Sequence, residues 1–148
     1  MSQIYVKIKK VRDNAKIPTY GSEHAAGADL YACINVEQNI PAGETVLVPT
    51  GIAAEIPESY VGLICARSGI ATKRGLAPAN KVGVIDSDYR GEILVPLHNH
   101  SKTSVSILPC ERIAQILFLP VSMALFSEIE EIEDTVRGSD GFGSTGRV

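Results

Sequence analysis

The sequence has few groups that could cross-link a small protein and no segment that could anchor it in a membrane. Only three of its 148 residues are cysteines, Cys33, Cys65 and Cys110, and they show no C-x-x-C spacing. Their odd number and wide separation argue against a disulfide framework and against a zinc site. The longest apolar runs, such as ILFLPV, are far shorter than the ~20 residues of a membrane helix, and the opening MSQIYVKIKK does not resemble a signal peptide. We therefore expect a soluble intracellular protein.

Positive charge is also scarce, and aromatic residues are few. The chain carries 14 Lys and Arg against 17 Asp and Glu, a formal net charge of -3 at pH 7. Without a sequence-wide positive field it should not attract a nucleic acid polymer or an anionic membrane, although a single nucleotide can bind locally. Hydrophobic residues make up 45% of the chain but aromatics only 5%. This aliphatic excess is easiest to explain if part of the surface is buried between subunits.

Short segments rich in β-branched residues fill most of the chain, and turns with glycine or proline separate them. In QIYVKIKKV, Ile4, Val6 and Ile8 alternate with Tyr5 and the lysines, the period-two pattern of a half-buried strand. Similar strands are expected at ETVLVP, YVGLICA, KVGVID, EILVPL and SVSILP. A chain of 148 residues with this pattern is most simply one domain, and we predict an all-β barrel or sandwich.

Two segments leave open whether the chain forms a strand or a short helix. ERIAQILFL places Ile113, Ile116 and Leu117 at helical spacing. SEIEEIED opens with Ser127 three residues before Glu130, the pattern of a capping box. Each segment is therefore a candidate for a short helix in an otherwise β-rich chain.

Polar residues gather in stretches that lie next to apolar segments. In AAGADLYA, Asp29 comes two residues after Gly27 and directly before the apolar Leu30, and an Asp close to a Gly is commonly a turn residue at the start of a strand. In ARSGIATKRG, Arg67, Ser68 and Gly69 follow a buried strand and offer a guanidinium, a hydroxyl and an unhindered backbone amide. These are the groups of a phosphate nest, although an ordinary loop has the same composition.

Two further stretches carry single polar groups near apolar runs. NKVGVIDSDYRGE predicts a β-hairpin that delivers Asp86 from the end of a strand into a tight turn and brings Tyr89 back. A carboxylate at the end of a hairpin strand is suited to general acid–base chemistry. In CERIAQ, Gln115 follows an apolar run, where a lone glutamine is commonly a satisfied core group.

The C-terminal RGSDGFGSTGRV contains the spacing G-x-G-x-x-G at Gly141, Gly143 and Gly146. In a dinucleotide fold these glycines open a helix, but only Arg147 and Val148 follow, so that interpretation fails. A disordered tail is one alternative. The other is a phosphate- and base-binding segment, because the tail also carries an arginine, a phenylalanine and two hydroxyls.

Taken in order, five of these stretches resemble the five ordered motifs of the trimeric deoxyuridine triphosphate nucleotidohydrolases, the dUTPases: AGADLYA, ARSGIA, GVIDSDYRGE, ERIAQ and RGSDGFGSTG. The resemblance runs from Ala26 to Gly146. It implies a jelly-roll-like all-β domain at residues 1–136 and a mobile lid at residues 137–148. It also implies a homotrimer with three shared active sites, each closed by a neighbour's lid, and a strand at ALFSEIEEIED.

The resemblance further implies Mg²⁺-dependent hydrolysis of dUTP to dUMP and pyrophosphate, which keeps uracil out of DNA and supplies dUMP for thymidylate synthesis. Asp86 would be the general base for the water that attacks the α-phosphorus, Asp29 would hold Mg²⁺ through its waters, and Tyr89 would pack on the deoxyribose. The implied substrate contacts are Arg67, Ser68, Gly69 and Gln115 for the phosphates, Asn80, Gly83, Val84 and Ile85 for the uracil, and Arg137, Phe142, Gly143, Ser144 and Thr145 in the lid.

Two other functions stay open at this point. A dCTP deaminase on the related fold is disfavoured because GVIDSDYRGE and GFGSTG match the hydrolase forms. A non-catalytic nucleotide-binding β module is disfavoured because every matched reacting group is present. The chain departs from the family pattern at Ala66, which replaces a usual proline, and at Cys110 and Asp140, which replace usual glycines.

Overall fold

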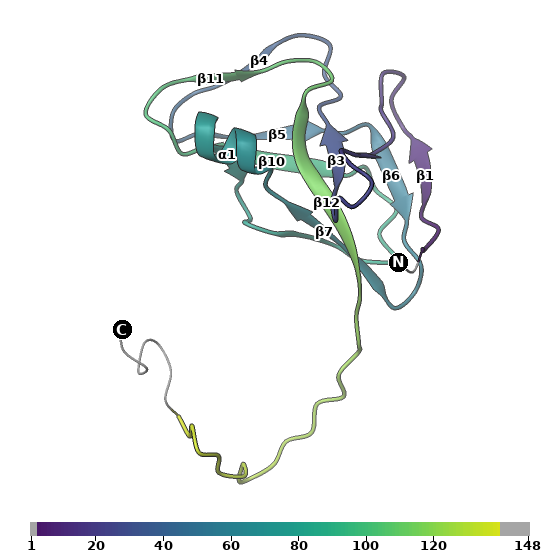
Figure 1. Ribbon diagram of the computed structural model, residues 1–148, viewed down its shortest axis with the longest axis vertical. Coiled ribbons are helices and arrows are strands. Elements are labelled where there is room, and N and C mark those ends of the chain that lie inside the picture. Colours follow the sequence, from purple (N-terminus) through teal and green to yellow (C-terminus); the bar gives the residue numbers. More distant parts are fainter. Residues whose placement is uncertain (1–2, 140–148) are drawn as a thin grey trace.

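The computed structural model describes residues 3–139, which form a β-rich body and a long C-terminal tail (Figure 1). The elements are β1 (Lys7–Lys10), β2 (Thr19–Tyr20), β3 (Ala28–Tyr31), β4 (Gln38–Ile40), β5 (Thr45–Pro49), β6 (Ile52–Glu55), β7 (Tyr60–Cys65), α1 (Ser68–Arg74), β8 (Leu76–Pro78), β9 (Gly83–Ile85), β10 (Leu94–Asn99), β11 (Val105–Ile107) and β12 (Arg112–Pro120). The predicted all-β fold is confirmed, with one short helix in the described part. Nowhere in residues 3–139 is a helix long and apolar enough to cross a membrane.

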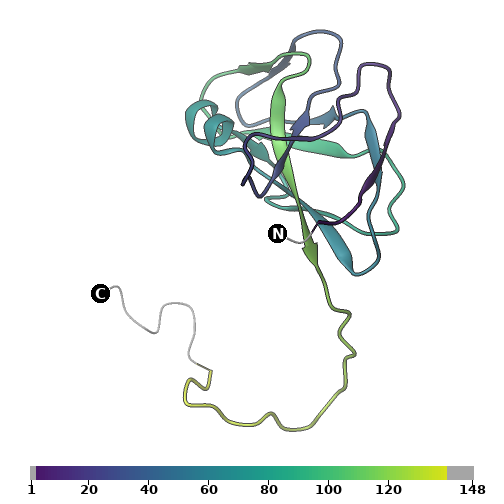
Figure 2. The ribbon, with the colours of Figure 1, turned by 45° about the vertical axis from the view of Figure 1, so that its right-hand side comes forward.

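The body is built from two larger antiparallel sheets. One has the order β2-β3-β12-β7-β9 and the other β5-β10-β8, with the pairs β1-β6 and β11-β4 at the margins. In Figures 1 and 2 the strands of the smaller sheet run across those of the larger one. The core contains Leu30, Ile64 and Ile116 from the larger sheet and Val95 and Leu97 from the smaller, each at most 3% exposed. Burying each such side chain contributes about 1.5–3 kcal/mol.

All six strands that the sequence analysis expected are present. Ile4, Val6 and Ile8 are half-buried while Tyr5 is 89% exposed, although β1 itself is shorter than the pattern. The other five expected strands form as β5, β7, β9, β10 and β11. No strand was predicted at β2, β4, β6 or β8, which have two to four residues each, and at β3 only a strand start was considered.

The segment ERIAQILFL forms the longest strand of the described chain, β12, and not a helix. It pairs with β3 on one side and with β7 on the other, so a helix here would leave two strand edges without partners. Ile113, Ala114 and Ile116 are buried in the core. The helical spacing of Ile113, Ile116 and Leu117 is therefore a coincidence, because Ile113 and Ile116 are buried as residues of a strand.

The hairpin predicted for NKVGVIDSDYRGE is wrong. β9 ends at Ile85, and a turn follows in which the Tyr89 N–H donates to the Asp86 carbonyl at 3.2 Å. The chain then enters β10, which belongs to the other sheet. The segment expected to pair with β9 as the second strand of the hairpin joins the other sheet instead, because Ile93 and Val95, both at most 1% exposed, are buried in the core.

The acidic segment that follows β12 forms neither the predicted helix nor the strand that the family pattern implies. Residues 121–139 contain no helix or strand and lead away from the body (Figures 1 and 2). Met123, Leu125 and Phe126 are each at least 95% exposed. In the single chain this segment pairs with no strand, and its apolar side chains stay exposed.

The helix α1 lies where we predicted only a loop, directly after Arg67. Its C-terminal signals are present in the sequence: Lys73 and Arg74 lie in the last turn, and Gly75 follows with a φ of 70°. With seven residues, including Gly69 and two β-branched side chains, α1 is too short for helical periodicity.

The turn before β12 places Cys110 in a conformation that favours glycine. The Glu111 N–H donates to the Leu108 carbonyl at 3.1 Å, so Pro109 and Cys110 are the central residues of the turn, and Cys110 has a φ of 62°. A side chain in this region costs on the order of 1 kcal/mol. The strain explains why the family pattern has glycine at this position.

We expect Cys110→Gly to be more stable than Cys110→Ala by about 1 kcal/mol, because both remove the thiol but only glycine relieves the positive φ. The measurement is the free energy of unfolding in urea. The matched pair is Cys65→Gly and Cys65→Ala, at an ordinary strand position, where alanine should be the more stable. The same order at both positions would contradict the assigned strain.

Candidate active site

A cavity of about 210 Å³ collects residues from three of the sequence stretches singled out above. Its lining consists of Gly21, Ala25, Gly27, Asp29, Arg67, Ser68, Gly69, Arg112 and Gln115. We call it the phosphate cavity, because guanidinium, hydroxyl and amide groups are the donors that bind phosphate. Five residues that the sequence nominated therefore lie together, and Arg112 joins them without having been nominated.

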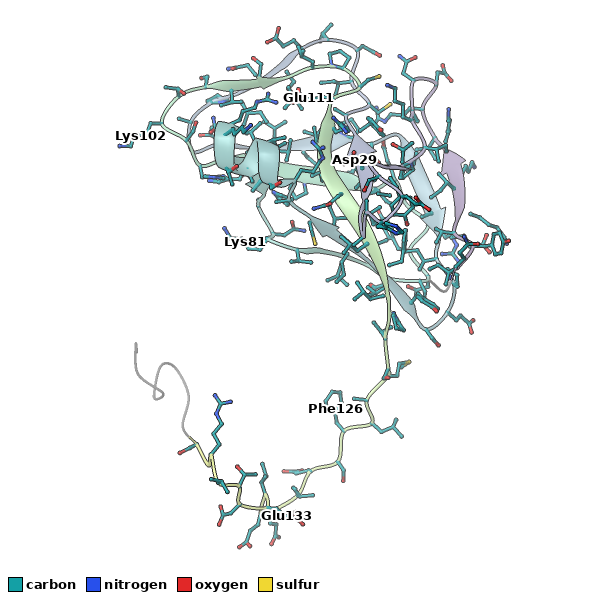
Figure 3. All side chains as sticks on the ribbon, viewed as in Figure 1. Asp29, Lys81, Lys102, Glu111, Phe126 and Glu133 are labelled. Carbon is teal, nitrogen blue, oxygen red and sulfur yellow. The ribbon has the colours of Figure 1, made fainter. Side chains whose placement is uncertain are left out.

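The register of the larger sheet brings these residues to one level. Gln115 of β12 lies opposite Asp29 of β3 on one side and opposite Cys65 of β7 on the other. Arg67 follows two residues after Cys65, at the start of α1. Figure 3 labels Asp29 on β3, beside β12. Segments distant in sequence thus meet at the end of one sheet.

Asp29 is buried, at 6% exposure, and is bound by two arginines. Its Oδ1 accepts a hydrogen bond from Arg67 Nε at 2.6 Å, and its Oδ2 accepts one from Arg112 Nη1 at 3.3 Å. Arg67 Nη1 also donates to the Arg112 carbonyl at 3.4 Å. A buried carboxylate is costly unless it is paired in this way. The simple turn role considered for Asp29 is therefore wrong, since it lies within β3.

Because Gly27 has no side chain, the Gln115 side chain can occupy the space next to it. A Cβ at position 27 would lie 2.6 Å from Gln115 Oε1, well inside contact distance. The Gln115 amide is held from its other end, because Nε2 donates to the Ala66 carbonyl at 2.9 Å. This hydrogen bond ties β12 to the segment that carries Arg67. Ser68 and Gly69 are exposed beside it.

A second cavity, of about 200 Å³, contains the predicted base. Its lining consists of Val84, Ile85, Asp86, Tyr89, Glu92, Ile93 and Leu94. The Tyr89 hydroxyl donates to the Glu92 carbonyl at 3.0 Å, which closes the turn that follows Asp86. We call this second cavity the base cavity. Asn80 and Gly83 lie at the other end of β9, where a Cβ on Gly83 would come within 3.3 Å of Asn80 Nδ2.

The two cavities share no residue and lie far apart in one chain. Asp29 and Asp86 belong to β3 and the end of β9, three strand positions apart, which corresponds to about 14 Å. Through Gln115, Asp29 is aligned with Cys65 of β7. Ile85 of β9 pairs with Gly62 of β7, so Asp86, one residue further on, is displaced from the position of Asp29 by four residues along the strand direction, or about 13 Å. The two carboxylates are therefore about 20 Å apart, well beyond the reach of one water.

Glu92 fastens the base cavity to the N-terminal part of the chain. Arg12 binds both of its carboxylate oxygens, at 2.6 and 2.9 Å, and the Gly51 N–H donates to one of them at 2.9 Å. The hydrogen bond from Arg12 holds the pKa of Glu92 below its ordinary value, with a smaller contribution from the Gly51 N–H. Sequence reasoning missed this pair, whose partners are 80 residues apart.

The described residues offer little to a magnesium ion. No three His, Cys, Asp or Glu side chains within residues 3–139 gather closely enough to hold a metal ion. Asp29, to which the resemblance assigns Mg²⁺ through water, directs both carboxylate oxygens at guanidiniums. Because two arginines repel a cation, these side chains do not fit a metal site of their own. The water-mediated role of Asp29 stays a prediction.

The predicted lid falls mostly outside the described part of the chain. Arg137 is exposed in the tail. The other four assigned lid residues lie beyond residue 139: Phe142, Gly143, Ser144 and Thr145.

Comparisons with known proteins show which family the chain resembles. A sequence model of the dUTPase family matches residues 13–146. A curated deoxyuridine 5'-triphosphate nucleotidohydrolase of Desulfitobacterium hafniense is 50% identical over 149 residues, and that of Shigella flexneri serotype 5b is 42% identical over 150, each match covering 99% of both chains. The solved dUTPase of Staphylococcus bacteriophage 80alpha with dUPNHPP superposes with a TM-score of 0.89, at 27% identity, covering 97% of this chain and 99% of that one.

We expect Glu92→Gln to lower the melting temperature at pH 7. The folded-state pKa of Glu92 is lowered, so its stabilising contribution is present above the ordinary value of about 4.3 and is lost as the pH falls through the lower folded value. Thermal melts from pH 7 to pH 3 should therefore show the variant and the unmodified chain converging at the acid end. Glu37→Gln, at an exposed position, is the control. Equal melting temperatures at pH 7 would contradict the role of Glu92.

Proposed function

The chain belongs to the dUTPase family and hydrolyses dUTP, and from this premise we propose which of its residues bind the nucleotide and carry out the reaction. The observation that carries the assignment is the family match over residues 13–146, which spans both cavities. The products are dUMP and pyrophosphate.

We propose that each active site forms between copies of the chain, in a homotrimer. The separation of about 20 Å between Asp29 and Asp86 supports this, because a phosphate held near Arg67 is beyond the reach of Asp86 in the same chain. The tail supports it as well. Its apolar side chains, including Leu125 and Phe126, are almost fully exposed and would be covered by a neighbouring copy.

The proposed phosphate contacts come from the phosphate cavity. Arg67 offers the guanidinium nitrogens that Asp29 does not engage, and Ser68 and Gly69 offer a hydroxyl and backbone amides at the exposed start of α1. Gln115 borders the same cavity, with its amide held against the Ala66 carbonyl. These groups would bind the triphosphate and orient its α-phosphorus toward the neighbouring copy's base cavity.

The proposed chemistry comes from the base cavity. Asp86 is exposed at its mouth and would accept a proton from the attacking water, so that the oxygen adds to the α-phosphorus as pyrophosphate leaves. Tyr89, anchored by its hydroxyl to the Glu92 carbonyl, would present its ring to the deoxyribose. The backbone of Gly83, Val84 and Ile85, together with Asn80, would meet the uracil edge.

Mg²⁺ is proposed as the ion that accompanies the triphosphate, whose oxygens and waters supply its ligands and whose charge it partly neutralises. We propose residues 137–148 as a lid over a neighbouring site, separate from the domain at residues 1–136. In the lid, Phe142 would stack on the uracil, while Arg137, Gly143, Ser144 and Thr145 would bind the γ-phosphate.

A substrate panel tests the function. With Mg²⁺, the purified chain should release pyrophosphate from dUTP at least ~100-fold faster than from UTP, dTTP or dCTP, because a site that hydrogen-bonds one base and excludes others reaches such ratios. Ammonia is measured in the same reactions. Its release from dCTP would favour the deaminase alternative, and binding of dUTP without turnover would favour a non-catalytic module.

A mixing experiment tests the shared site. Asp86→Asn and Arg67→Ala should each lower turnover by ~100-fold or more. If each site takes its phosphate cavity from one copy and its base cavity from the next, random 1:1 trimers of the two variants recover about a quarter of full activity, since one site in four escapes both changes. Subunits are exchanged by mild denaturation and refolding. Turnover that stays at the level of the single variants would contradict a site shared between copies.

A further inference from the structure

The phosphate cavity contains a second guanidinium that no sequence motif assigned. Arg112 opens β12, and its side chain is 51% exposed. One of its nitrogens, Nη1, lies 3.3 Å from Asp29 Oδ2. The other carboxylate oxygen of the same residue binds Arg67 at 2.6 Å. Asp29 thus bridges two arginines that border one cavity.

The charges of this cluster favour an anion. Among the residues that line the phosphate cavity, two guanidiniums face one carboxylate, and no other acidic side chain borders the space. The excess is therefore one positive charge. Asp29, 6% exposed, uses both of its oxygens on the arginines, whereas Arg112 directs only Nη1 at Asp29. A polyphosphate is attracted to such a cluster and a metal cation is repelled.

Asp29 is also placed so that it can hold the arginines in fixed positions. The β3–β12 register sets it opposite Gln115, and the Arg67 backbone is extended, with φ and ψ of -90° and 129°, just before α1. Arg67 Nη1 in turn donates to the carbonyl of Arg112 at 3.4 Å. Without the carboxylate the two guanidiniums would repel one another across the cavity, and each would have more rotamers available.

We propose that Arg112 binds the phosphate chain of the nucleotide together with Arg67, and that Asp29 is a positioning residue that holds both arginines. This rests on the proposed function, because the ligand is the triphosphate that the phosphate cavity would bind. If Asp29 has this positioning role, it affects the affinity for the nucleotide whether or not Mg²⁺ is bound.

The test measures binding of a nonhydrolysable imido analogue of dUTP to the full-length chain by calorimetry, once in EDTA and once with Mg²⁺. Arg112→Gln should raise the Kd by ~10- to 100-fold in both conditions, the range of a lost hydrogen bond to a charged group. Arg112→Lys should recover part of the affinity. The control is Lys102→Gln, whose charge lies in the loop between β10 and β11, far from Asp29 (Figure 3); this change should leave the Kd within twofold.

Asp29→Asn tests the positioning role. Its Kd should rise by the same factor in EDTA and in Mg²⁺, and by a smaller factor when Arg112→Gln is already present, because the two residues act together. An effect of Asp29→Asn confined to Mg²⁺ would overturn the positioning role. An unchanged Kd for Arg112→Gln would overturn the phosphate contact, and this variant decides the matter if Asp29→Asn does not fold.

The outcomes distinguish a failure of this inference from a failure of the proposed function. A wild-type chain that neither binds the analogue nor hydrolyses dUTP would refute that function. A wild-type chain that does both, with affinity indifferent to Arg112, would refute only the present inference.

Discussion

The position of β12 between β3 and β7 is the constraint on which the phosphate cavity depends. Because Gln115 pairs with Asp29 on one side and Cys65 on the other, three separate segments reach the cavity at one level. A slip of one residue would turn Gln115 toward the core and Ile116, now 1% exposed, toward the cavity. The burial of Ile113, Ala114 and Ile116 therefore stabilises the sheet and also fixes the alignment of the groups that line the phosphate cavity.

The same sheet limits what one chain can do. Its width separates β3 from β9, and the antiparallel register carries the end of β9 away from the phosphate cavity, so Asp29 and Asp86 stay about 20 Å apart. No side-chain rotation closes such a gap. This separation is the reason for proposing that a second copy completes the site, and the apolar residues that the tail exposes support the same proposal.

Sequence reasoning succeeded where the signal was local. Alternation along β5 and β10 predicted strands because burial on one face repeats every second residue, and the motifs nominated most of both cavities. It failed where partners were distant: the segment after Asp86 joins another sheet, and Arg12 binds Glu92 across 80 residues. No spacing in the sequence could indicate that the neighbours of Asp29 are guanidiniums, since that contact depends on how three strands align.

A carboxylate within the phosphate cavity reduces the attraction that the two arginines would exert on a phosphate. Two unpaired guanidiniums in this half-buried space would repel one another, and a ligand would have to order both side chains when it binds, at a cost of about 0.5–1.5 kcal/mol each. With Asp29 between them this ordering is complete before the ligand arrives. Asp29 thus lowers the Coulombic attraction for a phosphate but holds the arginines in place beforehand, and the proposed contact would use the nitrogens that Arg112 leaves exposed.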